Sequence, residues 1–287
     1  MTVNLRRTLT IKCAAAICAS TLMAAASFRF AVIGDTGTGG KAQYQVGERL
    51  ADTRRSFPFE SVLMLGDNLY GSQSPKDFET KFELPYAALL DAGVRFFAVL
   101  GNHDEFRQRI YQPFHMDGRS YYTFEPHPGV RFFGLDSNHV DRIQLAWLDA
   151  ELAKADGAWK FVYFHHPIYS SGARHGSNLP LRKALEPILV KHGVAAVFAG
   201  HDHFYERIKP QKGVQYFVVG GSSKLRAANV LRTELTAKAF DRDNSFLLVE
   251  IDGDQLRFRA ITRTGAMVDE GTIAKPAPHV GRGYSAE

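Results

Sequence analysis

Two histidines with one residue between them, His201 and His203, follow an apolar run at 194–199. The run carries β-branched and aromatic residues between Gly193 and Gly200, which is typical of a buried strand that ends at a turn. Where a chain leaves a strand, side chains two positions apart can point the same way. Imidazole is the commonest metal ligand, so the pair predicts a metal site, although alone it equally fits two polar loop histidines.

Residues that can bind a metal also follow four other predicted strands. They are Asp35 after 28–33, Asp67 and Asn68 after 59–65, Asn102 and His103 after 94–100, and His165 after 160–164. Each group alone fits an ordinary turn or helix cap. In open α/β sheets, however, functional groups collect at the carboxyl ends of the strands. The repetition at five strand ends therefore predicts one shared metal centre.

The ligand types indicate which metals the centre would take. Carboxylate, amide and imidazole groups without a thiolate suit iron, zinc or manganese. The candidate ligands outnumber the four of a tetrahedral zinc site, and they suffice for two metals if one carboxylate bridges them. Two metals a few ångströms apart activate water and stabilise charge in phosphoester hydrolysis. The ligand set is compatible with that chemistry.

Helices and strands alternate in the first half of the chain, which indicates the α/β class. We expect helices at 43–54, 78–91, 143–152 and 181–191, of which the second contains Pro85 as a possible break. An antiparallel pair is expected at 121–124 and 130–135, and later strands at 215–219, 245–251 and 255–262. The pattern fits mixed β-structure flanked by helices, either one twisted sheet or two sheets packed face to face.

The first 26 of the 287 residues have the composition of a secretory signal peptide. Arg6, Arg7 and Lys12 precede an uncharged apolar stretch that ends in three alanines, 24–26. We therefore predict a signal peptide at 1–26 and one domain at 27–287, exported to the periplasm or secreted, without a stable membrane anchor after cleavage. An N-terminal helix of the fold is the alternative, and the two arginines leave open whether export follows the twin-arginine route.

Cleavage would change both the charge and the cysteine content. The formal charge of +5 includes three positive charges from 1–26, so the mature chain would carry 5 − 3 = +2. This small charge gives no support to nucleic-acid binding. Cys13 and Cys18, the two cysteines, would leave with the signal, which excludes cysteine catalysis and thiolate metal sites.

Five short motifs in order resemble the calcineurin-like metallophosphoesterase superfamily. They are Gly34-Asp35-x-Gly37, Gly66-Asp67-Asn68-x-Tyr70, Gly101-Asn102-His103-Asp104, His165-x-Pro167 and Gly200-His201-Asp202-His203. Tyr70 makes the chain similar to the small, tartrate-resistant purple acid phosphatases, although a tyrosine merely packed beside the site is the alternative. The resemblance implies a four-layer α/β/β/α fold with mixed sheets face to face.

The resemblance also implies a role for each matched residue. Asp35, Asp67, Tyr70 and His203 would hold Fe(III), with Asp67 bridging to a second site of Asn102, His165 and His201 for Fe(II), Zn or Mn. His103 and His175 would face the substrate phosphate, with His103 also protonating the leaving group, and Asp104 and Asp202 would orient ring nitrogens of the site. No role is implied for His166.

The function expected is an exported binuclear phosphatase that hydrolyses small phosphomonoesters by attack of a metal-bound hydroxide. A phosphodiesterase or nucleotidase on the same scaffold is the alternative enzyme, and a non-catalytic phosphate- or partner-binding protein is the alternative class. The sequence gives no oligomeric state. The basic segment at 222–244, which includes Lys224 and Arg226, fits either a loop over the site or a solvated surface.

Overall fold

The computed structural model describes residues 27–277. The predicted signal peptide at 1–26 lies outside the described residues. Within the described part, no helix is both long enough and apolar enough to cross a membrane.

The first sheet has the strand order β13-β12-β11-β1-β2-β3. Its strands are β1 (Phe28–Ile33), β2 (Ser61–Met64), β3 (Arg95–Ala98), β11 (Ser245–Asp252), β12 (Gln255–Thr262) and β13 (Met267–Ala274). The three N-terminal strands run parallel to one another, whereas β11 joins β1 antiparallel and continues into the β12 and β13 meander. The sheet is therefore mixed.

The second sheet has the order β10-β8-β9-β7-β6-β5-β4. Its strands are β4 (Tyr122–His127), β5 (Val130–Gly134), β6 (Trp159–Phe164), β7 (Ala196–Ala199), β8 (Tyr205–Gln211), β9 (Val214–Val219) and β10 (Thr236–Phe240). The central strands β5, β6, β7 and β9 are parallel, and the outer strands are antiparallel. Parallel central strands bring several strand ends to the same edge, which is where the predicted ligands lie.

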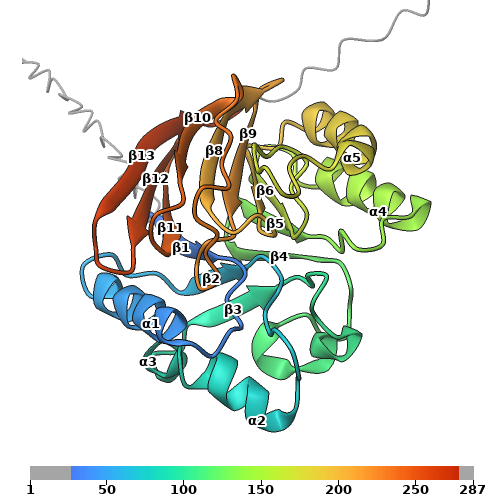
Figure 1. The fold of residues 1–287 in the computed structure, drawn as a ribbon. Coiled ribbons are helices and arrows are strands. Elements are labelled where there is room, and N and C mark those ends of the chain that lie inside the picture. The colour runs from blue at the N-terminus through green and yellow to red at the C-terminus, as the bar shows by residue number, and fades with distance from the viewer. Residues whose placement is uncertain (1–26, 278–287) are drawn as a thin grey trace, which may run out of the picture.

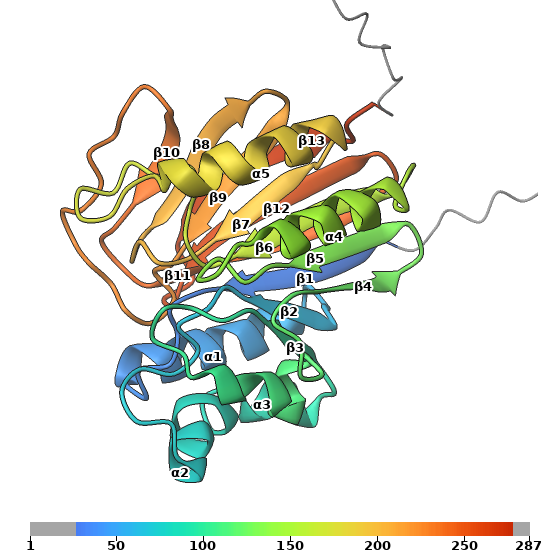
Figure 2. The same cartoon turned by 90° about the vertical axis from the view of Figure 1, so that its right-hand side faces the viewer.

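Helices cover the outer faces of both sheets (Figures 1 and 2). α1 (Lys41–Arg54) and α3 (Ala87–Asp91) lie against the first sheet, and α4 (Arg142–Ala153) and α5 (Leu179–Lys191) against the second. The inner faces meet through aromatic side chains, such as Phe30 of β1 against Phe132 of β5, with ring centroids 5.0 Å apart. The expected four-layer α/β/β/α arrangement is confirmed.

The expected helix at 78–91 is interrupted. A four-residue α2 (Pro75–Phe78) runs into a π-helical turn, Glu79–Glu83, and α3 begins only at Ala87. Pro85 lies in the break, because its ring cannot donate the hydrogen bond that a continuous helix needs at that position. Two short 3₁₀ turns, Phe106–Ile110 and Gln112–Phe114, follow β3.

An ion pair between a buried aspartate and a partly exposed arginine joins the two sheets at one edge. Asp269 of β13 accepts hydrogen bonds from Arg207 Nε at 2.7 Å and Nη2 at 3.2 Å, and from the Tyr205 hydroxyl at 2.8 Å, both residues of β8. Asp269→Ala would leave the guanidinium and the hydroxyl without their acceptor. We expect the free energy of unfolding to fall by about 2–3 kcal/mol, less than for a fully buried pair because Arg207 is partly exposed. Urea unfolding measures the change. Lys76→Ala, which removes an exposed ion pair with Glu79, is the control and should leave stability unchanged.

Candidate metal centre

The loops after β1, β2 and β7 bring one group of ligands together. The Tyr70 hydroxyl lies 3.0 Å from Asp35 Oδ1 and 3.3 Å from His203 Nε2. His203 Nε2 is 3.3 Å from the same Asp35 oxygen. Ligand atoms of Asp35, Asp67 and His203 lie within 4.8 Å of one another, and all three residues are buried. This group matches the ligands expected for the first metal.

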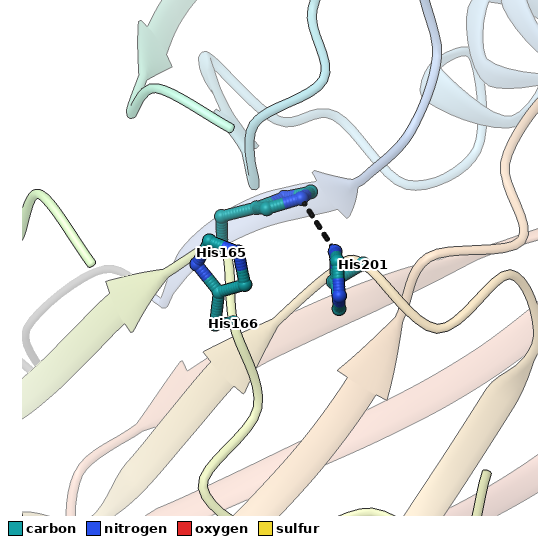
Figure 3. A group of neighbouring side chains, drawn as sticks. All are labelled: His165, His166 and His201. Atoms are coloured by element: carbon teal, nitrogen blue, oxygen red, sulfur yellow. Dashed lines mark hydrogen bonds between the residues drawn. The ribbon is translucent and has the colours of Figure 1, made fainter. Parts of the chain in front are cut away.

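A second group lies beside it, at the ends of β3, β6 and β7. His165 Nε2 is 3.0 Å from Asn102 Oδ1, 3.1 Å from His201 Nδ1 and 3.4 Å from Asp67 Oδ1. Figure 3 shows the rings of His165 and His201 directed toward each other, with His166 beside them. Asp67 is a neighbour of both groups, as a bridging carboxylate would be.

Three of these residues hold an unusual backbone conformation. Asp35, Asp67 and His201 have φ values of 55°, 50° and 68°. A residue other than glycine in this left-handed region costs of order 1–3 kcal/mol and persists only where its surroundings enforce it. Local strain at three candidate ligands indicates that the fold holds these side chains in positions they would not adopt by themselves.

At two glycines next to the ligands, the carboxylates approach the backbone so closely that no side chain would fit. A Cβ atom on Gly101 would lie 2.3 Å from Asp67 Oδ1, and one on Gly200 would lie 2.6 Å from Asp35 Oδ2. The backbone N–H groups of His103 and His201 donate to these same two carboxylates at 3.0 and 2.8 Å. Each carboxylate is therefore held by backbone at close range, and the second oxygen of Asp35, Oδ1, faces Tyr70 and His203.

The charges of the site fit a cation. Asp35 and Asp67 are 0% and 1% exposed, and within residues 27–277 neither forms an ion pair with lysine or arginine. Burial raises the pKa of Asp35 well above its usual range, and the Asp67 charge adds to the rise. Burial acts to raise the pKa of Asp67 as well, but the nearby His165 and the hydrogen bonds from Tyr70 and the His103 N–H together lower that pKa. Buried carboxylates side by side require a positive partner, and this donor set suits two metal ions.

Two of the imidazoles, His201 and His203, are held in the neutral form that a metal ligand needs. Burial lowers the pKa of His201 to about 2 and that of His203 to about 4, and for His203 the charges of Arg226 and Lys224 act in the same direction. Burial and the charges of Asp35 and Asp67 raise the pKa of Tyr70 far above its ordinary value. Tyr70 would therefore lose its proton only when a metal cation binds to its oxygen.

The two histidines expected to face the substrate flank the centre and are exposed. The His103 ring lies 4.9 Å from the Tyr70 ring, and the His175 ring lies 4.3 Å from the His201 ring, measured between centroids. Burial and the charge of Arg226 lower the pKa of His175. Both rings are thus placed beside candidate ligands, one on each side of the site.

The expected roles of Asp104 and Asp202 need correction, because neither carboxylate contacts an imidazole in a hydrogen bond. Asp104 accepts instead from the backbone N–H groups of Gly101 at 2.8 Å and Asn68 at 3.1 Å, and so ties the β2 and β3 loops together. Asp202 accepts from the Ser170 hydroxyl at 2.5 Å, in the loop that carries His175. Backbone amides hold the Asp104 carboxylate and a serine hydroxyl holds that of Asp202.

No role was expected for His166, yet its ring lies 4.5 Å from that of His201 and its Nδ1 is 2.9 Å from Ser137 Oγ. It forms a possible metal-binding group with His165 and His201. The basic loop at 222–226 also lies at the site, since the Lys224 Nζ is 3.8 Å from the centre of the Tyr70 ring. The adjacent histidine pair was the available signal for His166, whereas nothing local in the sequence places Lys224.

Comparison with known proteins gives consistent results. The family model for calcineurin-like phosphoesterases matches residues 28–205. The tartrate-resistant acid phosphatase type 5 of Oryctolagus cuniculus is 28% identical over 240 residues, 69% of this chain and 73% of that protein.

Two solved structures share the fold. GAP50, the anchor in the inner membrane complex of Plasmodium, has a TM-score of 0.73 at 19% identity, over 88% of this chain and 90% of that one. The purple acid phosphatase PPD1 of yellow lupin (Lupinus luteus) seeds has 0.74 at 16% identity, over 88% and 55%.

Proposed function

The chain belongs to the calcineurin-like phosphoesterase family, a family of hydrolases with a dimetal centre, and from this premise we propose that it is a purple acid phosphatase that hydrolyses small phosphomonoesters. The observation that carries the proposal is the pair of adjoining ligand groups around Asp67, one with Tyr70 and one with His165. A phenol among carboxylates and imidazole is an unusual ligand set, and it suits a ferric ion.

In this proposal each group holds one ion. Fe(III) would be held by Asp35, Asp67, Tyr70 and His203, and Fe(II), Zn or Mn by Asp67, Asn102, His165 and His201. When bound, the metals supply a Lewis acid that activates water and offsets charge on the phosphoryl group.

The remaining steps fall to side chains of this protein. The exposed imidazoles of His103 and His175 lie on either side of the centre, where both can donate hydrogen bonds to phosphoryl oxygens. His103 would also give its proton to the leaving oxygen. The backbone N–H of His103 donates to Asp67, which ties the chain segment that carries this ring to the centre.

Metal analysis with a visible spectrum of the purified protein tests the proposal. We expect two metals per chain and a tyrosinate-to-iron charge-transfer band, which Tyr70→Phe should abolish while most of the metal stays bound. Tyr44→Phe, at an exposed position on α1, is the control and should keep the band. A colourless wild-type protein that holds two metals would refute the ferric–tyrosinate assignment, and a metal-free protein after metal-supplemented expression would refute the binuclear centre.

The substrate preference has its own test. A phosphatase of this kind should cleave 4-nitrophenyl phosphate with a much higher kcat/KM than bis(4-nitrophenyl) phosphate. The reverse order would favour the phosphodiesterase alternative. A metal-replete protein inactive on both would favour a binding function. GAP50, which shares the fold, is described as an anchor.

We also propose that residues 1–26 direct export and that the phosphatase acts as one domain, 27–287, in the periplasm or outside the cell. Support comes from the basic and apolar pattern of 1–26. Mass spectrometry of the protein recovered from the cell exterior or periplasm should find an N-terminus near residue 27.

A further inference from the structure

Gln73 is a buried side chain that joins two loops of the site. It lies in the loop after β2, three positions after Tyr70, and is 2% exposed. Its Nε2 donates to the carbonyl oxygen of Leu69 at 3.2 Å, in the same loop, and to that of His103 at 2.8 Å, in the loop after β3. Its Oε1 accepts from the backbone N–H of Glu105 at 2.9 Å. One amide group therefore holds the segment that carries His103 at two points.

The partners of the Gln73 amide determine its orientation. A backbone carbonyl only accepts a hydrogen bond and a backbone N–H only donates one, so the amide oxygen and nitrogen cannot exchange places. Gln108, fully buried in the turn Phe106–Ile110, donates from Nε2 to Gln73 Oε1 at 2.9 Å and to Asp104 Oδ1 at 2.8 Å. Gln108 in turn accepts from the Asn68 side-chain amide at 3.1 Å. Both donors and the acceptor of the Gln73 amide are in use, which leaves this side chain a single position.

His103 is held through its backbone, and its ring nitrogens are left for other partners. Its N–H donates to Asp67 at 3.0 Å, and its carbonyl oxygen accepts from Gln73 at 2.8 Å. Within residues 27–277, neither ring nitrogen of His103 forms a hydrogen bond with the protein, and the ring lies 4.9 Å from that of Tyr70. The two peptide groups that flank His103 therefore determine where its ring lies. One of them is held by a candidate metal ligand and the other by Gln73.

The neighbouring candidate ligand, Asn102, is held by other contacts. Its Oδ1 belongs to the second ligand group, and the backbone N–H of the preceding Gly101 donates to Asp104 at 2.8 Å. Neither contact involves Gln73. Loss of the Gln73 amide should therefore release the backbone of His103 and leave the metal ligands in place.

We propose that Gln73 is a positioning residue for the proton transfer by His103, and this inference rests on the proposed phosphatase function. In that transfer the bond from phosphorus to the leaving oxygen breaks, its electron pair stays on that oxygen, and the proton of the imidazolium joins it. Water supplies the new oxygen on phosphorus. A proton donor must lie within hydrogen-bond distance of the oxygen that it serves, and a displacement of about 1 Å can lower a rate by about 10²-fold. By holding the His103 carbonyl, Gln73 would keep the ring at that distance without contacting the substrate.

The first test measures kcat and KM for phenyl phosphate and 4-nitrophenyl phosphate in Gln73→Met, which keeps the length of the side chain and removes its hydrogen bonds. We expect kcat for phenyl phosphate to fall by about 10- to 100-fold, with a smaller loss for 4-nitrophenyl phosphate, whose leaving group needs less help from a proton donor. KM should change by less than about threefold, and two metals should stay bound. Gln255→Met, at the exposed start of β12, is the matched control and should behave as wild type.

A double-mutant cycle with His103→Ala tests whether Gln73 acts through His103. In the His103→Ala protein, Gln73→Met should cause no further loss of kcat. A further loss as large as in the wild-type background would overturn the proposal, because Gln73 would then act by another route. Equal losses on the two esters in Gln73→Met, or no loss on either, would overturn it as well.

If Gln73→Met unfolds or loses its metals, Gln73→Glu decides. Its ionised carboxylate still accepts from the Glu105 N–H but cannot donate to the His103 carbonyl, so kcat should fall as predicted with both metals bound. An unchanged kcat, or loss of the metals here too, would overturn the proposal. If the wild-type protein hydrolyses neither ester, the proposed function fails. Calorimetry with orthophosphate then decides the positioning separately, since Gln73→Met should weaken phosphate binding only while His103 is present.

Discussion

Asp67→Ala is expected to lower the metal content from two ions per chain to none and the phosphatase activity by more than about 10³-fold. The reason is that Asp67 neighbours both ligand groups. Its Oδ1 lies 3.4 Å from His165 Nε2, and its carboxylate also contacts Tyr70. Removing one side chain therefore takes a ligand from each ion. Elemental analysis of the purified variant, together with its rate on 4-nitrophenyl phosphate, measures both effects.

Asp67→Asn separates loss of charge from loss of structure, since the amide keeps the shape of the side chain and can still accept from the His103 N–H. Asp91→Ala, at the exposed end of α3, removes a carboxylate far from the site and serves as the control. If Asp67→Asn folds normally and retains both ions at full occupancy, Asp67 does not bridge them.

His103→Ala is expected to slow turnover by about 10²–10⁴-fold while both metals stay bound, because this range is typical for the loss of a general acid. His103 is exposed, its ring lies 4.9 Å from the Tyr70 ring, and its backbone N–H donates to Asp67, so its imidazole nitrogens are not needed to hold a metal. The loss should be larger for phenyl phosphate than for 4-nitrophenyl phosphate, because the more acidic nitrophenol needs less help from a proton donor.

His127→Ala is the matched control. His127 lies at the β4–β5 turn, at the end of the second sheet away from the metal centre, so this variant should retain the full rate. An equal loss of rate for both esters in His103→Ala would leave His103 a phosphate-binding role without proton transfer. An unchanged rate would remove it from the mechanism.

The sequence predicted the strands that are buried on both faces, because their apolar runs are continuous. The ends of β1 and β7 show this, and they led directly to Asp35 and His201. It missed β8, β10 and β13, which lie at or next to sheet edges and carry charged residues such as Glu206 and Lys238. Pairing with a neighbour, and not their own composition, makes them strands.

The same limit applies inside the site. Tyr70 and the ligand histidines follow strands closely, so their placement could be predicted from local order. Lys224 and Arg226 reach the site only through hydrogen bonds that span the fold, such as the one from Gly34 N–H to Ser222, 188 residues away in sequence. No local sequence pattern predicts such a contact, and the basic segment that contains both residues therefore fitted a solvated surface equally well.

The two ligand groups draw on both sheets. Asp35, Asp67 and Asn102 follow strands of the first sheet, and His165, His201 and His203 follow strands of the second. The strands of one sheet alone do not supply all the candidate ligands of either ion, so each bound metal would link the two sheets. The ligand geometry that would select among iron, zinc and manganese would then exist only after the two sheets have packed together. The compartment in which the chain folds, through the ions available there, would decide which enzyme the same sequence becomes.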